Sequence, residues 1–132
     1  TIDHVNLRIP TQSIVELGEF HERLGFEAEG LEELRSGELP FFDIRLDGDH
    51  VIHLWPDRDF SAPTGKNYHH MALTVDAPIE EVEEELVAAG VEVTDINETP
   101  KGATGWAPSL YVDDPAGYTL ELKQHHRHGA DP

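Results

Sequence analysis

The sequence predicts a small α+β domain built from two tandem β-α-β-β-β modules. Alternating strand patterns open two regions of the chain, an amphipathic helix pattern follows each of them, and a repeat distance recurs. That distance is 66 residues from His4 to His70 and 65 residues from Gly25 to Gly90. Offsets this similar indicate a duplicated module with small insertions. Where the strands curve, the two modules are expected to form a mixed sheet that encloses a cavity.

The first module spans about residues 1–56 and begins with an alternating strand over residues 2–9. Apolar residues at helical spacing follow this strand. Ser13, with Glu16 three residues later, offers a capping box at the start of the helix, and Gly25 ends it. Three short strands complete the module. They are expected near residues 27–34, 41–47 and 50–56, with a hairpin turn before the last.

The second module spans about residues 67–124 and begins with an alternating strand over residues 69–75. Pro78 suits the first turn of the following helix, and Gly90 ends that helix. A Pro- and Gly-containing turn over residues 114–117 precedes the last strand. The three strands after the helix are expected near residues 91–97, 107–113 and 118–124.

A length of 132 residues fits one domain, residues 1–132, and suffices to bury a core. Segments 57–68 and 98–106 are rich in Gly, Pro and polar residues, so we expect loops there and not domain linkers. Residues 125–132 form a His-rich tail. The chain has no cysteine and no apolar run of about 20 residues, which excludes thiolate sites and predicts no membrane span. A cytoplasmic protein is expected.

Charge is the most unusual bulk property of the chain. Asp and Glu number 27 against 9 Lys and Arg, for a formal net charge of −18. Such a surface repels nucleic acid and anionic lipid, so neither is an expected partner. Salt screens the self-repulsion of the acidic surface, and we interpret the composition as halophilic. The acidic run over residues 80–85 indicates a solvated helix face and not a catalytic carboxylate pair.

Four side chains that can bind a metal share one strand phase. Side chains alternate between the two faces of a strand, and the apolar phase should pack under the helices. The opposite phase then lines the cavity, and each module places one donor there on its first strand and one on its last. These donors are His4, His53, His70 and Glu121. Three imidazoles and one carboxylate suit one divalent ion of Zn, Ni, Fe or Mn better than Mg or Ca.

Further polar and aromatic side chains share the cavity phase and are candidates to orient a small-molecule substrate. They are Asn6, Arg8, Arg45, Trp55, Ser109 and Tyr111. Either arginine could pair with a substrate anion or, equally, with a surface carboxylate. His69 falls in the opposite phase and is left out of the metal set, while His21 is expected to be a half-buried packing residue.

Several segments resemble the vicinal oxygen chelate superfamily, which includes glyoxalase I, fosfomycin-resistance enzymes, extradiol dioxygenases and bleomycin-resistance proteins. The resemblance covers nearly the whole chain and rests on residues 3–5, 24–26, 70–76 and 114–122. The D-P-x-G-x-x-x-E string that closes the second module is its most specific part. The second half is most similar to glyoxalase I, including the P-K-G motif at residues 100–102.

The resemblance implies that the first and last strands of each module carry the metal ligands, which are again the three histidines and Glu121. The chain departs from glyoxalase I at His53, where that enzyme has a glutamate that is both ligand and base. Glu121, or a metal-bound hydroxide, is then the expected proton carrier. The resemblance also suggests a homodimer in which two chains complete one cavity, with a site inside one chain as the alternative.

The implied function is that of a metal-dependent, glyoxalase-like lyase or isomerase whose substrate chelates the metal through neighbouring oxygens. Two alternatives within the superfamily stay open: a ring-cleaving extradiol-type dioxygenase and a fosfomycin-resistance-type thiol transferase. A third alternative belongs to another class of protein, a non-catalytic protein that sequesters a drug or metabolite.

Overall fold

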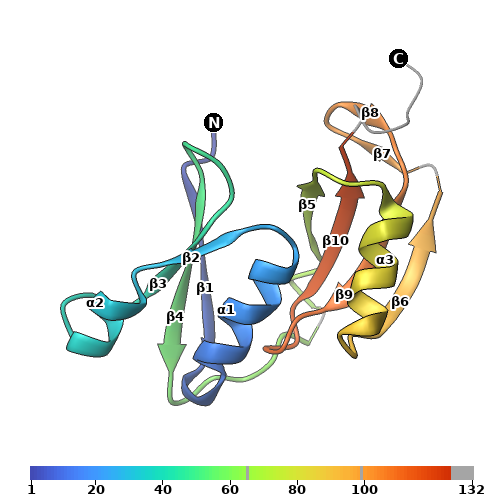
Figure 1. Cartoon of the computed structure of the whole chain (residues 1–132). Coiled ribbons are helices and arrows are strands. Elements are labelled where there is room, and N and C mark those ends of the chain that lie inside the picture. The colour runs from blue at the N-terminus through green and yellow to red at the C-terminus, as the bar shows by residue number, and fades with distance from the viewer. Residues whose placement is uncertain (65, 99, 126–132) are drawn as a thin grey trace. The chain divides into compact units, whose positions relative to one another are not determined.

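The computed structural model describes residues 1–64, 66–98 and 100–125 and divides into two compact units, Thr1–Ala62 and Pro63–Pro132 (Figure 1). Each unit contains one four-stranded mixed sheet and a helix that follows its first strand. The predicted α+β class and the two β-α-β-β-β modules are therefore confirmed. Most of the His-rich tail, including two of its three histidines, lies outside the described residues.

The first unit arranges its strands in the order β1-β4-β3-β2. Its first and last strands, β1 and β4, are parallel neighbours, and the other pairs are antiparallel. Helix α1 follows β1 and contacts β2. The elements are β1 (His4–Pro10), a 3₁₀ turn (Thr11–Ser13), α1 (Ile14–Arg23), β2 (Glu27–Glu29), α2 (Leu31–Ser36), β3 (Phe42–Arg45) and β4 (Val51–Asp57).

The second unit repeats this arrangement in the order β5-β10-β9-β6, with β5 and β10 parallel (Figure 1). Helix α3 takes the place of α1, and a two-stranded β7–β8 ribbon lies between β6 and β9 in the sequence. The elements are β5 (Met71–Val75), α3 (Ile79–Ala88), β6 (Val93–Asn97), β7 (Lys101–Gly102), β8 (Gly105–Trp106), β9 (Ser109–Asp113) and β10 (Thr119–Gln124).

The two sheets share one register as well as one strand order. Asn6 pairs with His53 across β1 and β4, and Ala72 pairs with Glu121 across β5 and β10. Both Asn6 and Ala72 lie two residues after a histidine of the predicted metal set. Each unit therefore holds its two candidate ligands at corresponding positions of neighbouring parallel strands.

Alternating burial confirms the predicted strand phases on β1, β4 and β5, whereas β10 is buried on both faces after Thr119. On β4, Ile52 and Leu54 are buried, while Val51, His53 and Trp55 are only partly covered. In the second unit the core residues of β5, β9, β10 and α3 are Leu73, Val75, Ile79, Val82, Leu86, Leu110, Val112, Leu120 and Leu122. A fully buried side chain of this kind contributes about 1.5–3 kcal/mol, so burial of the apolar phase fixes which face stays available for chemistry.

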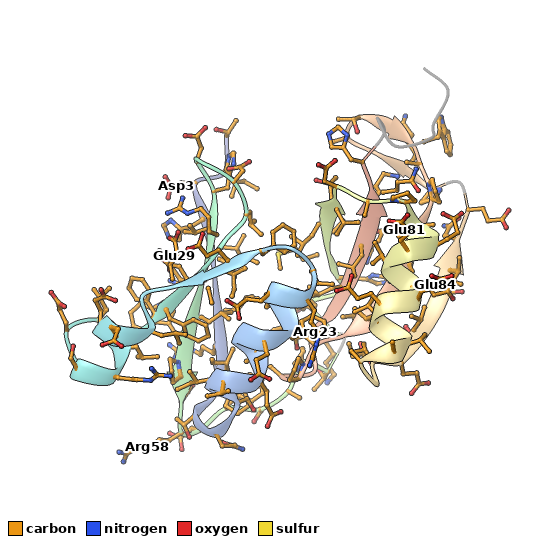
Figure 2. The ribbon with its side chains drawn as sticks, in the orientation of Figure 1. Asp3, Arg23, Glu29, Arg58, Glu81 and Glu84 are labelled. Atoms are coloured by element: carbon orange, nitrogen blue, oxygen red, sulfur yellow. The ribbon has the colours of Figure 1, made fainter. Side chains whose placement is uncertain are left out.

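The acidic face of α3 is solvated as predicted. Glu81 and Glu84 are exposed on this helix (Figure 2), while its buried face carries Ile79, Val82 and Leu86. Across the described ranges, none of the helices is both long enough and apolar enough to span a membrane.

The strand predicted over residues 27–34 is wrong in its second half. Strand β2 ends at Glu29, and α2 begins directly after Gly30, whose φ of +83° is left-handed. A strand cannot continue through that conformation, which glycine adopts at low cost. Two glutamates in the first turn of α2 then favour the helix through its dipole.

Two smaller expectations also fail. Residues 11–13 form a 3₁₀ turn, and within the described chain the buried Ser13 hydroxyl makes no capping bond to α1. Segment 98–106, predicted to be a loop, contains the β7–β8 ribbon. The predicted helix stops are correct, because Gly25 and Gly90 adopt φ of +94° and +82° directly after the C-cap residues Leu24 and Ala89.

Candidate metal centre and substrate cavity

The first unit brings two predicted ligands into ring contact. The imidazoles of His4 on β1 and His53 on β4 have centroids 4.3 Å apart. Each ring also has a carboxylate at its Nδ1: Asp3 Oδ1 lies 2.8 Å from His4, and Asp43 forms a short hydrogen bond with His53. When Nδ1–H donates to a carboxylate, Nε2 carries the lone pair that a metal ion binds.

Asp43 was not among the predicted site residues, although its strand phase could have identified it. Asp43 lies on β3 between the buried Phe42 and Ile44 and pairs directly with His53 on β4. The F-D-I-R pattern therefore places its carboxylate on the cavity face. A carboxylate behind a histidine ligand fixes the tautomer and the ring orientation.

The second unit brings together the other predicted pair. His70 directly precedes β5, and its Nε2 lies 3.0 Å from Oε1 of Glu121 on β10. The Glu121 side chain is only 9% exposed. His69, which the strand phase had excluded, lies with its Nδ1 2.6 Å from Nδ1 of His70. All three candidate histidine ligands therefore use Nδ1 for a protein partner.

Tyr111 lies behind this second pair. It pairs with Glu121 across β9 and β10, and its ring meets the His70 ring edge-on at 5.3 Å. Burial raises the pKa of Tyr111, and the charge and hydrogen bonding of Glu121 raise it further. The phenol therefore keeps its proton and can donate it in a hydrogen bond to the carboxylate.

Three of the predicted substrate residues line one hollow in the first unit. Asn6, Arg8 and Trp55 border a cavity of about 340 Å³. Arg8 pairs with Trp55 in the β1–β4 register, one row beyond Asn6 and His53. The structure thus gathers these three side chains next to the His53 position.

The two predicted arginines each have a carboxylate partner, and the predicted serine is buried. Arg45 donates to Glu29 Oε1 over 3.1 and 3.2 Å, and this pairing raises its pKa. Arg8 likewise donates to Asp57 Oδ2 over 3.2 Å. Ser109 is fully buried, and its hydroxyl has no partner within the part of the chain that the structure describes. Both arginines therefore have the carboxylate partner that was one of their two expected roles.

Lys123 is a further neighbour of Glu121 that was not among the predicted site residues. It lies two residues after Glu121, is only 6% exposed, and donates from Nζ to the carbonyls of Pro100 (2.8 Å) and Ala107 (3.0 Å). A Cβ at Gly102 would lie 2.7 Å from its Cε. Lys123 thus ties the segment that carries β7 and β8 to β10.

The donor chemistry fits a divalent ion, and the donors occur as one pair in each unit. Among the described residues no three metal-binding side chains are already gathered into one cluster. Two atoms bound to one tetrahedral ion at about 2.1 Å lie about 3.4 Å apart, slightly farther than the 3.0 Å between His70 and Glu121. A small opening of this pair would admit an ion.

Comparison with known proteins gives the fold a wider context. No protein-family model matches the chain, and no curated protein matches its sequence. Among solved structures, a virulence protein from Salmonella typhimurium is similar at 25% identity and a TM-score of 0.71, over 95% of this chain and 96% of that one.

Two further structures are similar over nearly their whole length. A glyoxalase/dioxygenase from Nostoc punctiforme has 16% identity and a TM-score of 0.71, with 94% of this chain and 90% of that one covered. A glyoxalase family protein from Enterococcus faecalis has 24% identity and a TM-score of 0.61, with 93% and 96% covered. The chain therefore has the α+β fold of glyoxalase/dioxygenase family proteins, as the resemblance to the vicinal oxygen chelate superfamily implied.

Proposed function

We propose that the protein is a metal-dependent, glyoxalase-like lyase or isomerase that acts on a small substrate with two neighbouring oxygens. The observation that supports this most directly is the anchoring of two candidate histidine ligands. His4 and His53 each have a carboxylate at Nδ1, which is how histidines that bind metal are commonly held.

The proposed ligands are His4, His53, His70 and Glu121, and the ion is Zn, Ni, Fe or Mn. Such an ion would polarise the two substrate oxygens and stabilise negative charge that develops on them.

Glu121 is the proposed proton carrier. Its carboxylate is almost fully covered, so few water molecules compete for it, and Tyr111 can hold one of its oxygens through a hydrogen bond. A carboxylate positioned in this way can take a proton from a carbon next to a polarised carbonyl and return it to the neighbouring carbon. The proposed substrate-orienting residues are Asn6, Arg8, Arg45, Trp55, Ser109 and Tyr111.

A ring-cleaving dioxygenase is the second candidate, favoured by the histidine at position 53. A two-base isomerase needs a second base near the substrate, and the Nδ1 of His53 is already occupied by Asp43. Two histidines and one glutamate are the ligand set of non-haem Fe(II) oxygenases.

One experiment separates these functions. Protein purified without a nickel column is analysed for metal and then assayed with methylglyoxal plus a thiol and, separately, for oxygen uptake with a catechol. We expect about one divalent ion per site and turnover of the thiol adduct; Fe(II) with oxygen uptake would favour the dioxygenase. Protein that holds no stoichiometric metal would overturn the proposal and leave sequestration.

We further propose a homodimer in which His4 and His53 of one chain meet His70 and Glu121 of the other. Mixing His4→Ala with Glu121→Ala tests this, because a heterodimer of the two then contains one intact site and one doubly broken site. Metal binding should return to about half of the heterodimer sites. If both ligand pairs come from one chain, mixing restores nothing, and a strictly monomeric protein in molar salt excludes the shared site.

The acidic composition is the basis for a proposed halophilic, cytoplasmic setting. At low salt, the net charge of −18 destabilises the compact chain by self-repulsion. Screening reaches within about 10 Å at 0.1 M and is tighter above that concentration, so the melting temperature should rise up to molar potassium chloride. A flat or falling melting temperature would contradict halophily.

A further inference from the structure

The cavity of the first unit lies one row along the strands from a candidate metal ligand. Arg8 and Trp55 pair across β1 and β4, and the neighbouring row on the same face contains Asn6 and His53. Rows two residues apart are separated by roughly 6.6 Å along a strand. With a volume of about 340 Å³, the cavity is at the lower end of ligand pockets, which span about 300–1,000 Å³. It therefore fits a small molecule that also reaches the His53 row.

One side of this region is aromatic. Phe41 stacks against Trp55 with centroids 5.2 Å apart and an interplanar angle of 31°. Phe41 also contacts His53 at 4.2 Å, and His53 contacts His4 at 4.3 Å, so four rings form a continuous row. Aromatic side chains have few rotamers and offer flat apolar faces, which favour a planar partner.

The polar groups at the cavity are mainly hydrogen-bond donors. The Asn6 amide can donate hydrogen bonds. Arg8 adds a positive charge at this surface, with a side chain that is 71% exposed and is held by Asp57.

We propose that this cavity binds the carboxylate of a small planar acid, aromatic or conjugated, whose ring or double bond lies against Phe41 and Trp55. This inference deepens the proposed function, because the other oxygens of such an acid would point along the strands toward His53. Arg8 and the Asn6 amide recognise the carboxylate, and the aromatic row selects planarity. Binding to the cavity itself does not require the metal.

The test uses Trp55 as a reporter in metal-free protein. The chain has two tryptophans, so Trp106→Phe leaves Trp55 as the only indole. Fluorescence is titrated in 1 M potassium chloride, which screens the repulsion of an anion by the acidic chain. The probes are benzoate (planar anion), benzamide (planar and neutral) and cyclohexanecarboxylate (non-planar anion). Benzoate should quench Trp55 saturably, with the other two at least about tenfold weaker.

Two arginine variants identify the cation that is responsible. In the Trp106→Phe background, Arg8→Gln should weaken benzoate about tenfold and leave benzamide unchanged. Arg35→Gln is the matched control, because Arg35 is an exposed arginine of the same unit on α2. It should leave both affinities unchanged.

Each outcome decides the inference. Benzamide binding as tightly as benzoate would overturn recognition of the charge, and equal binding of cyclohexanecarboxylate would overturn recognition of planarity. Absence of saturable quenching by all three probes would overturn the site. Selective benzoate binding by a protein that takes up no stoichiometric metal would support this site while the proposed enzymatic function fails, and metal uptake without benzoate binding would show the reverse.

Discussion

The two units place different side chains at corresponding positions of one strand register. In the first unit the last-strand donor is His53, with Asp43 opposite it on β3. In the second unit the corresponding pair is Glu121 with Tyr111 on β9. A carboxylate behind an imidazole makes a better metal ligand, while a phenol beside a carboxylate positions a group that can move protons. The two units thus share backbone positions but place different side chains there, and under the proposed function these side chains have different roles.

The helices differ at one buried position. His21 lies four residues before Gly25, and Leu86 lies four residues before Gly90, so the two positions correspond. His21 is 2% exposed and Leu86 is 1% exposed. Burial lowers the pKa of His21 from 6.5 to about 4, and its Nδ1 has no partner within the described residues. The first unit therefore contains a titratable group in a place where the second contains a plain apolar one.

The largest expected effect is the loss of metal binding when a ligand is removed from either pair. We expect His4→Ala, His70→Ala and Glu121→Ala each to abolish stoichiometric metal binding. His53→Ala should only weaken it, because three ligands and a water form a sufficient site in many enzymes. Metal analysis after competition with a chelator measures both outcomes. Wild-type metal content in all four variants would contradict the assignment.

The next effect tests the difference between α1 and α3. Between about pH 6.5 and 4 the unfolded chain protonates His21 and the folded chain does not. The free energy of unfolding therefore decreases as pH falls through this window. His21→Leu, which copies Leu86, removes this loss. Its stability advantage should therefore grow by up to about 3 kcal/mol from pH 7 to pH 4.

Urea unfolding of both proteins at several pH values measures this difference, and the comparison cancels the titration of the many shared carboxylates. A constant difference across the window would show that burial of His21 does not govern its protonation. Leu86→Val is a suitable control, because it alters the corresponding packing without adding a titratable group.

Lys123 has no counterpart lysine in the first unit. Removing its amine should lower the free energy of unfolding by an intermediate amount. Lys123→Met removes the donor that the Pro100 and Ala107 carbonyls share, at a cost of about 2 kcal/mol. Hydrogen exchange should then rise in residues 100–107. Lys101→Met is the control, because Lys101 is exposed on β7. Equal exchange in the two variants would show that Lys123 does not hold residues 100–107 against β10.

The smallest expected effect is a difference in metal affinity between variants of Asp43 and Tyr111. Asp43→Asn should weaken metal affinity about tenfold, because a partner behind a histidine ligand commonly contributes that much. Tyr111→Phe should change affinity less and reduce turnover more, since Tyr111 contacts the proposed proton carrier. If the two variants rank the other way in metal titrations, the division of roles between the units is wrong.

Much of the fold could be predicted because it follows from local periodicity. The alternation of β1, β4, β5 and β10 identified the buried phase, and the glycines that end α1 and α3 need only their own positive φ. The strand after α1 was predicted too long, because a short apolar pattern fits a strand and a short helix such as α2 equally well. Gly30 marked that boundary, but its left-handed conformation is visible only in the structure.

The sequence by itself determined the α+β class, the duplication and the phase that presents His4, His53, His70 and Glu121, since each depends on spacing along one strand or helix. Only the tertiary structure decided which side chains support them. Asp43 meets His53 through the β3–β4 pairing, and Lys123 reaches the carbonyl of Pro100, 23 residues earlier. Such contacts depend on the register between strands. Hydrogen bonds between distant segments and burial of the apolar face together set that register.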